Sequence, residues 1–220
     1  FIVLADANLE RAAPAAAEAR LLNSGQSCIA AKRFIVVEPV FERFLERFVA
    51  AVAARRLGDP LAAGTDVGPQ ARADLRANLQ RQVEESVRRG AKLVLGGHVP
   101  EGPGFFYPPS VLTAVEHGMP AFDEEVFGPV AAVIRVRDDA DAVRVANASP
   151  YGLGAAVWTE DRERGERLAA ELEVGSVFVN GLVKSDPRLP FGGVKRSGYG
   201  RELSEFGLRE FVNVKSVWVG

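Results

Sequence analysis

Cysteine is almost absent from this sequence, which contains Cys28 as its single example in 220 residues. One cysteine excludes a disulfide within the chain, and a lone thiol is typical of proteins from reducing compartments. We therefore predict a cytoplasmic protein. The thiol of Cys28 is left for chemistry or for plain packing, and composition alone does not choose between them.

Long hydrophobic runs and a strong net charge are also missing. The apolar runs are short and interrupted by charged residues, far below the roughly 20 residues that a membrane-spanning helix needs. No basic stretch followed by an apolar core indicates a signal peptide. The formal net charge is −2, without a basic stripe. These absences argue against a membrane and against nucleic acid as partners, and the ordinary composition indicates a globular protein.

Short apolar runs typical of strands alternate along the chain with amphipathic stretches typical of helices. From Val40 to Val52, for example, the apolar residues fall on one helical face. Such alternation predicts an α/β fold, a parallel sheet with helices on both faces. The predicted strands are 1–4, 34–37, 92–95, 131–136, 155–158 and 176–179, and the predicted helices are 8–23, 40–52, 74–89, 139–148 and 162–172.

The C-terminal stretch 210–219 alternates apolar and polar residues, which predicts a further strand. A terminal strand with no later element to cover it is an exposed edge unless it pairs with another chain. We therefore divide the chain into a catalytic domain, 1–205, and an oligomerisation segment, 206–220, and we expect a homo-oligomer.

The segment NSGQSC, residues 23–28, surrounds the cysteine with small residues and a Gly-Gln turn. A thiolate attacks carbonyl carbon well, and backbone N–H groups at such a turn can hold a developing oxyanion. A buried free cysteine packed beside Ile29 is the plainer reading, and it is the better one for this segment taken alone.

Two later segments carry polar and glycine-rich patterns. EEVFGPV, 124–130, places two acids beside an aromatic, which suits the hydroxyls of a ribose and a flat ring, although a helix end followed by a turn into a strand is the better reading of this segment taken alone. PFGGVKRSGYGRE, 190–202, holds four glycines but matches neither phosphate-binding glycine pattern. Lys195 and Arg196 are interpreted as surface charges.

Five segments in this order, NSGQSC, EEVFGPV, NASPYGLGAAVWT, SVFVN and PFGGVKRSGYGRE, resemble the aldehyde dehydrogenase superfamily, and the similarity runs through essentially the whole chain. The resemblance implies the catalytic domain of that family, with Cys28 as the nucleophile and NAD or NADP as cofactor. It implies that Glu125 binds the nicotinamide ribose and that Phe127 lies beside the nicotinamide ring. Glu202 matches a glutamate assigned to proton relay, with a salt bridge as the alternative.

The C-terminal stretch and the loop before PFGG resemble the bacterial succinate-semialdehyde dehydrogenase branch, so a small aldehyde with a remote carboxylate is the expected substrate. Some of these enzymes place an arginine six residues before the cysteine, but this chain has Leu22 there. We assign the substrate carboxylate to Lys184, Ser185 and Arg188, against the alternative of a solvated polar loop. No metal ligand is assigned.

In the family, a Glu-Leu-Gly-Gly motif with the general base, an oxyanion-hole asparagine and the NAD-binding domain precede the strand that begins at Phe1. The sequence starts at Phe1, and its single methionine is Met119. We therefore expect a fragment without useful dehydrogenase activity alone, because general-base help contributes about 10²–10⁴-fold. Rival readings are a non-catalytic relative that retains the fold, and an enzyme that passes the thioester to coenzyme A.

Overall fold

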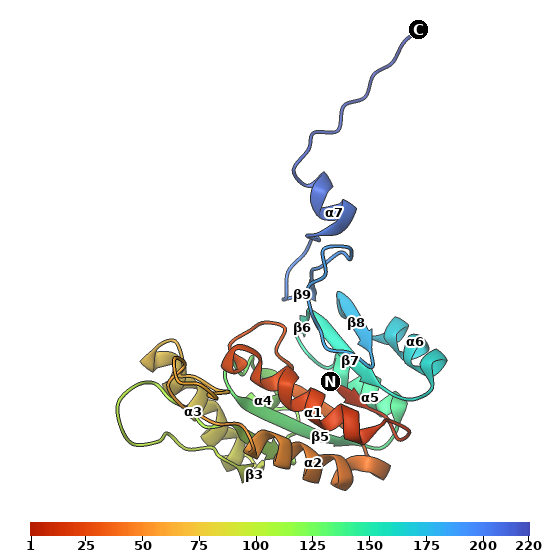
Figure 1. Cartoon of the computed structure of the whole chain (residues 1–220). Coiled ribbons are helices and arrows are strands. Elements are labelled where there is room, and N and C mark those ends of the chain that lie inside the picture. The colour runs from red at the N-terminus through yellow and green to blue at the C-terminus, as the bar shows by residue number, and fades with distance from the viewer.

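The computed structural model describes all 220 residues and is built around a seven-stranded, mostly parallel sheet (Figure 1). The strand order is β3-β4-β5-β2-β1-β7-β8, with β3 antiparallel to β4 and every other neighbouring pair parallel. The predicted α/β class is confirmed. The strands of this sheet are β1 (Ile2–Val3), β2 (Arg33–Val37), β3 (Lys92–Leu95), β4 (Ser110–Thr113), β5 (Val130–Val136), β7 (Gly154–Trp158) and β8 (Ser176–Val179).

Helices join these strands and cover both faces of the sheet. The side chains of Asn8, Asp138 and Asp161 cap α1, α5 and α6. Each accepts a hydrogen bond from the backbone N–H three residues later. No helix is both long and apolar enough to cross a bilayer. The helices are α1 (Leu9–Leu21), α2 (Phe41–Ala53), α3 (Ala73–Arg88), α4 (Pro120–Asp123), α5 (Asp139–Asn147), α6 (Arg162–Glu171) and α7 (Ser204–Arg209), with 3-10 turns at Leu22–Gly25 and Glu38–Val40.

An aromatic cluster marks the face that α2 covers. The ring of Phe34 on β2 lies 4.7 Å from Phe48 on α2 and 5.5 Å from Phe1, centroid to centroid. Arg33 precedes Phe34 and so points to the opposite face. There its guanidinium donates to the carbonyls of Val145 and Ala146 at 2.9 and 2.8 Å, which seats the end of α5 on that face.

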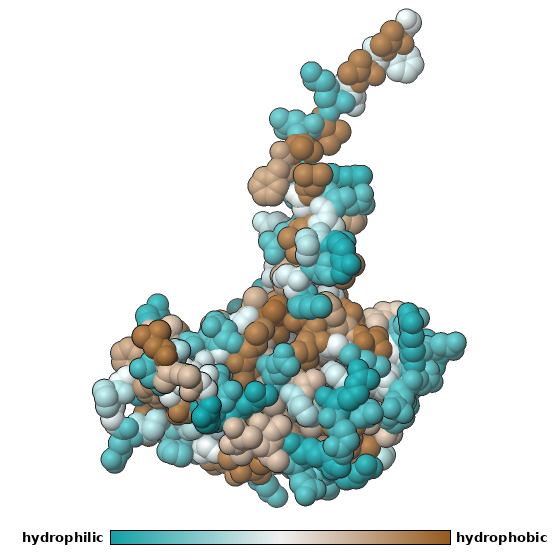
Figure 2. Space-filling view, viewed as in Figure 1, coloured by the Kyte–Doolittle hydropathy of each residue, from teal (hydrophilic) through white to brown (hydrophobic).

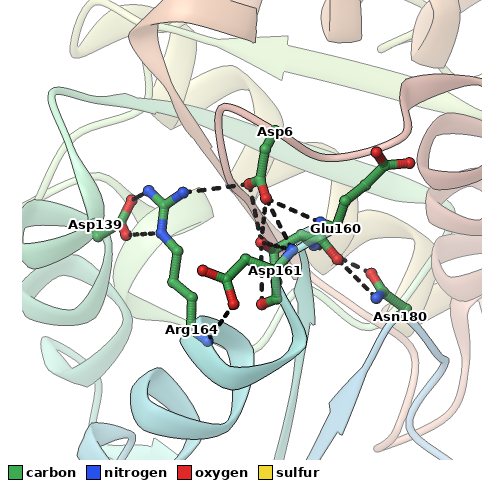
Figure 3. Close-up of polar contacts among 7 residues, drawn as sticks. Asp6, Asp139, Glu160, Asp161, Arg164 and Asn180 are labelled. Carbon is green, nitrogen blue, oxygen red and sulfur yellow. Dashed lines mark hydrogen bonds and ion pairs between the residues drawn. The ribbon is translucent and has the colours of Figure 1, made fainter.

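A polar cluster ties together the carboxyl ends of three strands (Figure 3). Asp6, after β1, accepts hydrogen bonds from the Thr159 hydroxyl at 2.7 and 2.9 Å and from the Glu160 and Asp161 amides at 3.0 Å. Asn180, after β8, exchanges two hydrogen bonds with the Thr159 backbone. These hydrogen bonds therefore join the ends of β1, β7 and β8 to one another.

Several elements differ from the sequence prediction. Helix α1 runs through Pro14, and β4, α4 and α7 were not predicted, nor was the antiparallel pair β6 (Tyr151–Gly152) and β9 (Val194–Lys195). The predicted strand over 210–219 is wrong for the isolated chain. After α7 the chain extends away from the body with no neighbouring strand, and Trp218 is 92% exposed (Figures 1 and 2).

Candidate active site

A cavity of about 380 Å³ opens along the amino ends of the parallel strands. The loops before β2 and β5 contribute Cys28 and Glu125 to its wall, strand β6 contributes Tyr151, and Leu22 lines it just after α1. Most of the lining is apolar. Open α/β sheets usually bind ligands at the carboxyl ends of their strands. Here the Asp6 cluster lies at that edge, and Cys28 and Glu125 lie at the opposite edge.

The loop that carries Cys28 has an unusual backbone. Asn23 and Ser24 adopt left-handed φ angles of 51° and 57°, and Gly25 follows at 74°. Left-handed residues other than glycine are uncommon and tend to mark functional sites. The fully buried Arg20 stabilises this turn by donating a hydrogen bond to the Gly25 carbonyl at 2.9 Å. Cys28 itself is free and exposed, so the packing alternative of a buried thiol does not describe it.

Gln26 and Ser24 fasten this loop to the segment before α3. The Gln26 side chain donates to the Pro69 carbonyl at 3.2 Å and accepts from the Ala71 amide at 2.8 Å. The Ser24 hydroxyl accepts from the Gly68 amide at 2.9 Å. The Gly-Gln pair of the motif therefore supplies an anchor as well as a turn, which the sequence analysis did not predict.

Glu125 and Phe127 lie together between α4 and β5. The carbonyl of Glu125 accepts from Gln82 at 3.1 Å, while its carboxylate stays 42% exposed and faces Lys32. The ring of Phe127 is also partly exposed, at 36%. An accessible carboxylate next to an accessible ring is a geometry that a ribose and its attached flat base can use. The neighbouring Glu124 is instead paired with Arg81.

Lys32 was missed by the sequence analysis, and it lies between these two segments. Its Nζ lies 3.5 Å from Glu125 Oε1, and it also donates to main-chain carbonyls of the Cys28 loop. Burial, and after it the charge of Arg20, lowers the pKa of Lys32 to about 8, with Glu125 and Cys28 acting in the opposite direction. A lysine four residues after a cysteine gives no sequence signal of this role, because lysine is ordinarily a surface residue.

The other predicted site residues do not line this cavity. Glu202 pairs through its backbone with Phe191, by two hydrogen bonds of 2.8 Å, and is exposed. Arg188 makes a two-point contact with Asp186 at 2.6 and 2.9 Å, and this contact holds the pKa of Asp186 below its usual range.

The loop that carries Arg188 instead contributes Leu182 and Val183 to the cavity wall. The substrate ligands Lys184 and Ser185 are absent from that wall. Arg196, interpreted from sequence as a surface charge, does contribute to it, with its guanidinium 5.8 Å from the Tyr151 ring centroid.

Known proteins share this sequence and this fold. The chain is 52% identical over 218 residues to succinate semialdehyde dehydrogenase Sad of Escherichia coli, a match that covers 99% of this chain and 47% of that protein. It is 49% identical to the NADP(+) succinate-semialdehyde dehydrogenase 1 of Mycobacterium tuberculosis, covering 100% and 48% respectively. The chain therefore spans about half the length of the curated relatives it matches.

A solved structure gives the same result in three dimensions. The succinic semialdehyde dehydrogenase of Streptococcus pyogenes, determined with NADP+, superposes with a TM-score of 0.96 at 37% identity, over 100% of this chain and 48% of that one. The sequence profile of the aldehyde dehydrogenase family matches residues 1–217, which confirms the resemblance seen in the five segments. This chain belongs to the aldehyde dehydrogenase family.

Proposed function

We propose that this chain is the nucleophile-bearing part of an NAD(P)-dependent aldehyde dehydrogenase that oxidises succinate semialdehyde to the carboxylate. The observation that carries the proposal is the exposed Cys28 beside Glu125 on one cavity, in a chain about half identical to dehydrogenases named for that substrate. The single reduced cysteine also supports a cytoplasmic location.

In this proposal the Cys28 thiolate bonds to the aldehyde carbon, and the carbonyl electron pair moves to oxygen to give a thiohemiacetal. The left-handed turn at Asn23, Ser24 and Gly25 supports this step, because backbone N–H groups near such a turn can donate to that oxygen. The chemistry that a bound nicotinamide cofactor supplies is acceptance of a hydride from this carbon. Water then cleaves the resulting thioester, which releases the carboxylate and restores the thiol. Glu202 is proposed to relay the proton removed from that water.

The cofactor fits the groups that are present. The Glu125 carboxylate is partly exposed and is held by a cation instead of a second carboxylate, so both oxygens can accept ribose hydroxyls. Phe127 offers an accessible ring face beside it. These two residues would hold the nicotinamide end, and the Leu22 side of the cavity would remain apolar.

For the substrate carboxylate we retain Lys184, Ser185 and Arg188 as the proposed ligands. The Arg188 guanidinium is paired with the Asp186 carboxylate. To bind the substrate carboxylate it must leave Asp186 or contact both carboxylates at once. We also propose residues 1–205 as the catalytic domain and 206–220 as the oligomerisation segment. The extended, exposed stretch that follows α7 supports the second part, and the boundary between the two falls inside α7 (Figure 1).

The test is an assay of the protein expressed from the full reading frame around this sequence, with succinate semialdehyde and NADP or NAD. We expect reduced cofactor to form, and Cys28→Ser to lower kcat by at least about 10³-fold because the nucleophile is lost. Lys92→Met, at an exposed position on β3, is the matched control. A Cys28→Ser protein with normal turnover would rule out the mechanism, and turnover only with coenzyme A would establish the acylating alternative.

A further inference from the structure

Lys32 contacts two segments that are far apart in the sequence. Its Nζ lies 3.0 Å from the Ala30 carbonyl, 3.3 Å from that of Cys28 and 3.4 Å from that of Ser27. The same atom lies 3.5 Å from Glu125 Oε1. One ammonium therefore links the loop of the proposed nucleophile to the carboxylate of the proposed cofactor site.

The loop needs this cation for its shape. Residues 26–32 lie outside helices and strands, and the carbonyls of Cys28 and Ala30 accept no hydrogen bond from the main chain. Carbonyls in a partly buried loop require a donor from elsewhere, because leaving them unpaired is costly. Lys32 is that donor, and its side chain is only 19% exposed. A substitution that removes the ammonium would free the backbone on both sides of the thiol.

Charged groups from several segments act on the Lys32 ammonium. The groups that act on the Lys32 ammonium are Arg20, Glu125 and Cys28, and Arg20 is fully buried behind the same loop. Arg33, next along the chain, turns to the other side and bonds the carbonyls at the end of α5. Lys32 is thus the cation whose ammonium contacts the main chain of Cys28 itself, at 3.3 Å. A cation beside a cysteine favours its ionised form.

We propose that Lys32 is a positioning residue for the proposed nucleophile, holding residues 27–30 and the Glu125 carboxylate on one ammonium while its charge favours the Cys28 thiolate. This inference rests on the proposed function for its biological meaning. Its physical content is independent of that function, since it concerns the reactivity of one thiol in the folded chain.

The experiment measures the rate at which iodoacetamide alkylates the 220-residue chain as a function of pH. Cys28 is the single cysteine, so the rate reports one thiol. Lys32→Met should slow alkylation at pH 7 by about three- to tenfold and shift the pH–rate curve to higher pH. Lys32→Arg, which keeps the charge, should stay within about twofold of the unaltered chain, and Lys92→Met at an exposed position on β3 should not change the rate.

An unchanged pH–rate curve for Lys32→Met, or an equal loss in Lys32→Arg, would overturn the proposal. If far-ultraviolet circular dichroism shows that Lys32→Met does not fold, Glu125→Gln decides. That variant removes the negative charge that competes with the thiolate for the ammonium, and it should speed alkylation by about threefold or more. A slower or equal rate would overturn the proposal. Alkylation requires neither aldehyde nor cofactor, so a failed dehydrogenase assay with these rates intact would remove the proposed function alone.

Discussion

At the scale of single residues, Gly25 joins the two motifs that the sequence displays far apart. A Cβ built on Gly25 would lie 2.2 Å from the Gly128 carbonyl oxygen and 2.8 Å from the Pro129 nitrogen. The glycine of the cysteine loop therefore packs directly on the backbone of the Glu125 segment. Its left-handed φ of 74° is a second reason for glycine at this position.

We expect Gly25→Ala to be strongly destabilising, by about 3 kcal/mol or more, because the methyl group meets backbone that cannot move aside without disturbing both loops. Urea denaturation followed by circular dichroism measures the change. Gly118→Ala is the matched control, since Gly118 has a φ of 93° and open space where its Cβ would stand. That control isolates the backbone strain, of about 1 kcal/mol. Equal losses in the two variants would contradict the close approach.

Lys32 also predicts a dependence of stability on pH. Its pKa is lowered from 10.5 to about 8, first by burial, so the folded chain releases this proton before the unfolded chain does. Between these values the unfolded state binds more protons, and the free energy of unfolding rises with pH. Below pH 8 the buried ammonium is a cost. The rise from this group is at most about 3 kcal/mol, at about 1.4 kcal/mol per unit of pKa.

The measurement compares the unaltered chain with Lys32→Met across this range, so that other titrating groups cancel. We expect the unaltered chain to gain stability relative to the variant as pH rises from about 8 to about 10.5. Lys92→Met, at an exposed position on the edge strand β3, should run parallel to the unaltered chain. Parallel curves for Lys32→Met would contradict the lowered pKa.

The sequence alone predicted those site residues whose amino-acid type itself indicates a chemical role. Cys28 and Glu125 were predicted, and the structure brings them to one cavity. Lys32 and Arg20 were missed because lysine and arginine are ordinarily exposed, and burial depends on the tertiary fold. Arg188 was predicted from its charge, but the sequence does not indicate that its guanidinium forms an ion pair with Asp186, two residues earlier.

At the scale of elements, the Asp6 cluster explains how short strands are held at one edge of the sheet. Strand β1 has two residues, and β8 has four residues with partly exposed side chains. Asp6 and Asn180 both bind Thr159, at the end of β7 between them. Burial raises the pKa of Asp6, but the hydrogen bonds from Thr159 and Asp161, with the charge of Arg164, outweigh it and leave the pKa below its usual value.

Asp6→Asn should therefore destabilise the chain at neutral pH by about 1–3 kcal/mol, because the amide presents N–H groups to donors that need an acceptor. A lowered carboxyl pKa stabilises above the ordinary value of 3.8 and loses its contribution as pH falls through the folded value. The difference between the unaltered chain and the variant should accordingly shrink in acid. Glu160→Gln, whose backbone joins the cluster while its side chain is exposed, is the control in thermal unfolding (Figure 3).

Most helices and strands were predictable because their apolar periodicity is strong. The exceptions have a common physical cause. Strand β4, with sequence SVLT, is short and fully buried, so it shows no alternation to detect. The pair β6 and β9 joins residues that are more than forty positions apart, and pairing over that distance leaves no local pattern. The alternation in 210–219 is real, but a strand also needs a partner.

At the scale of the whole molecule, the exposed apolar side chains of the tail, residues 210–220, have no packing partner within a single chain. Beyond α7 its apolar side chains are exposed, with Phe211 at 89%, Val214 at 95% and Trp218 at 92% (Figure 2). Figure 2 also shows apolar surface on the body where the tail leaves it. Exposed alternating apolar residues tend to pair with another strand, which agrees with the proposed oligomerisation segment.

Removal of residues 211–220 should therefore change association without changing the fold of the body. We expect the full chain to sediment as an oligomer and the truncated chain as a monomer, with similar circular dichroism, because the tail residues are almost fully exposed and stabilise little of the body. Val214→Ser combined with Val217→Ser keeps the length while removing apolar contacts, and should also weaken association. If the truncated chain remained oligomeric at the same concentration, the contact between copies would have to lie on the body, and the alternation in the tail would need another explanation.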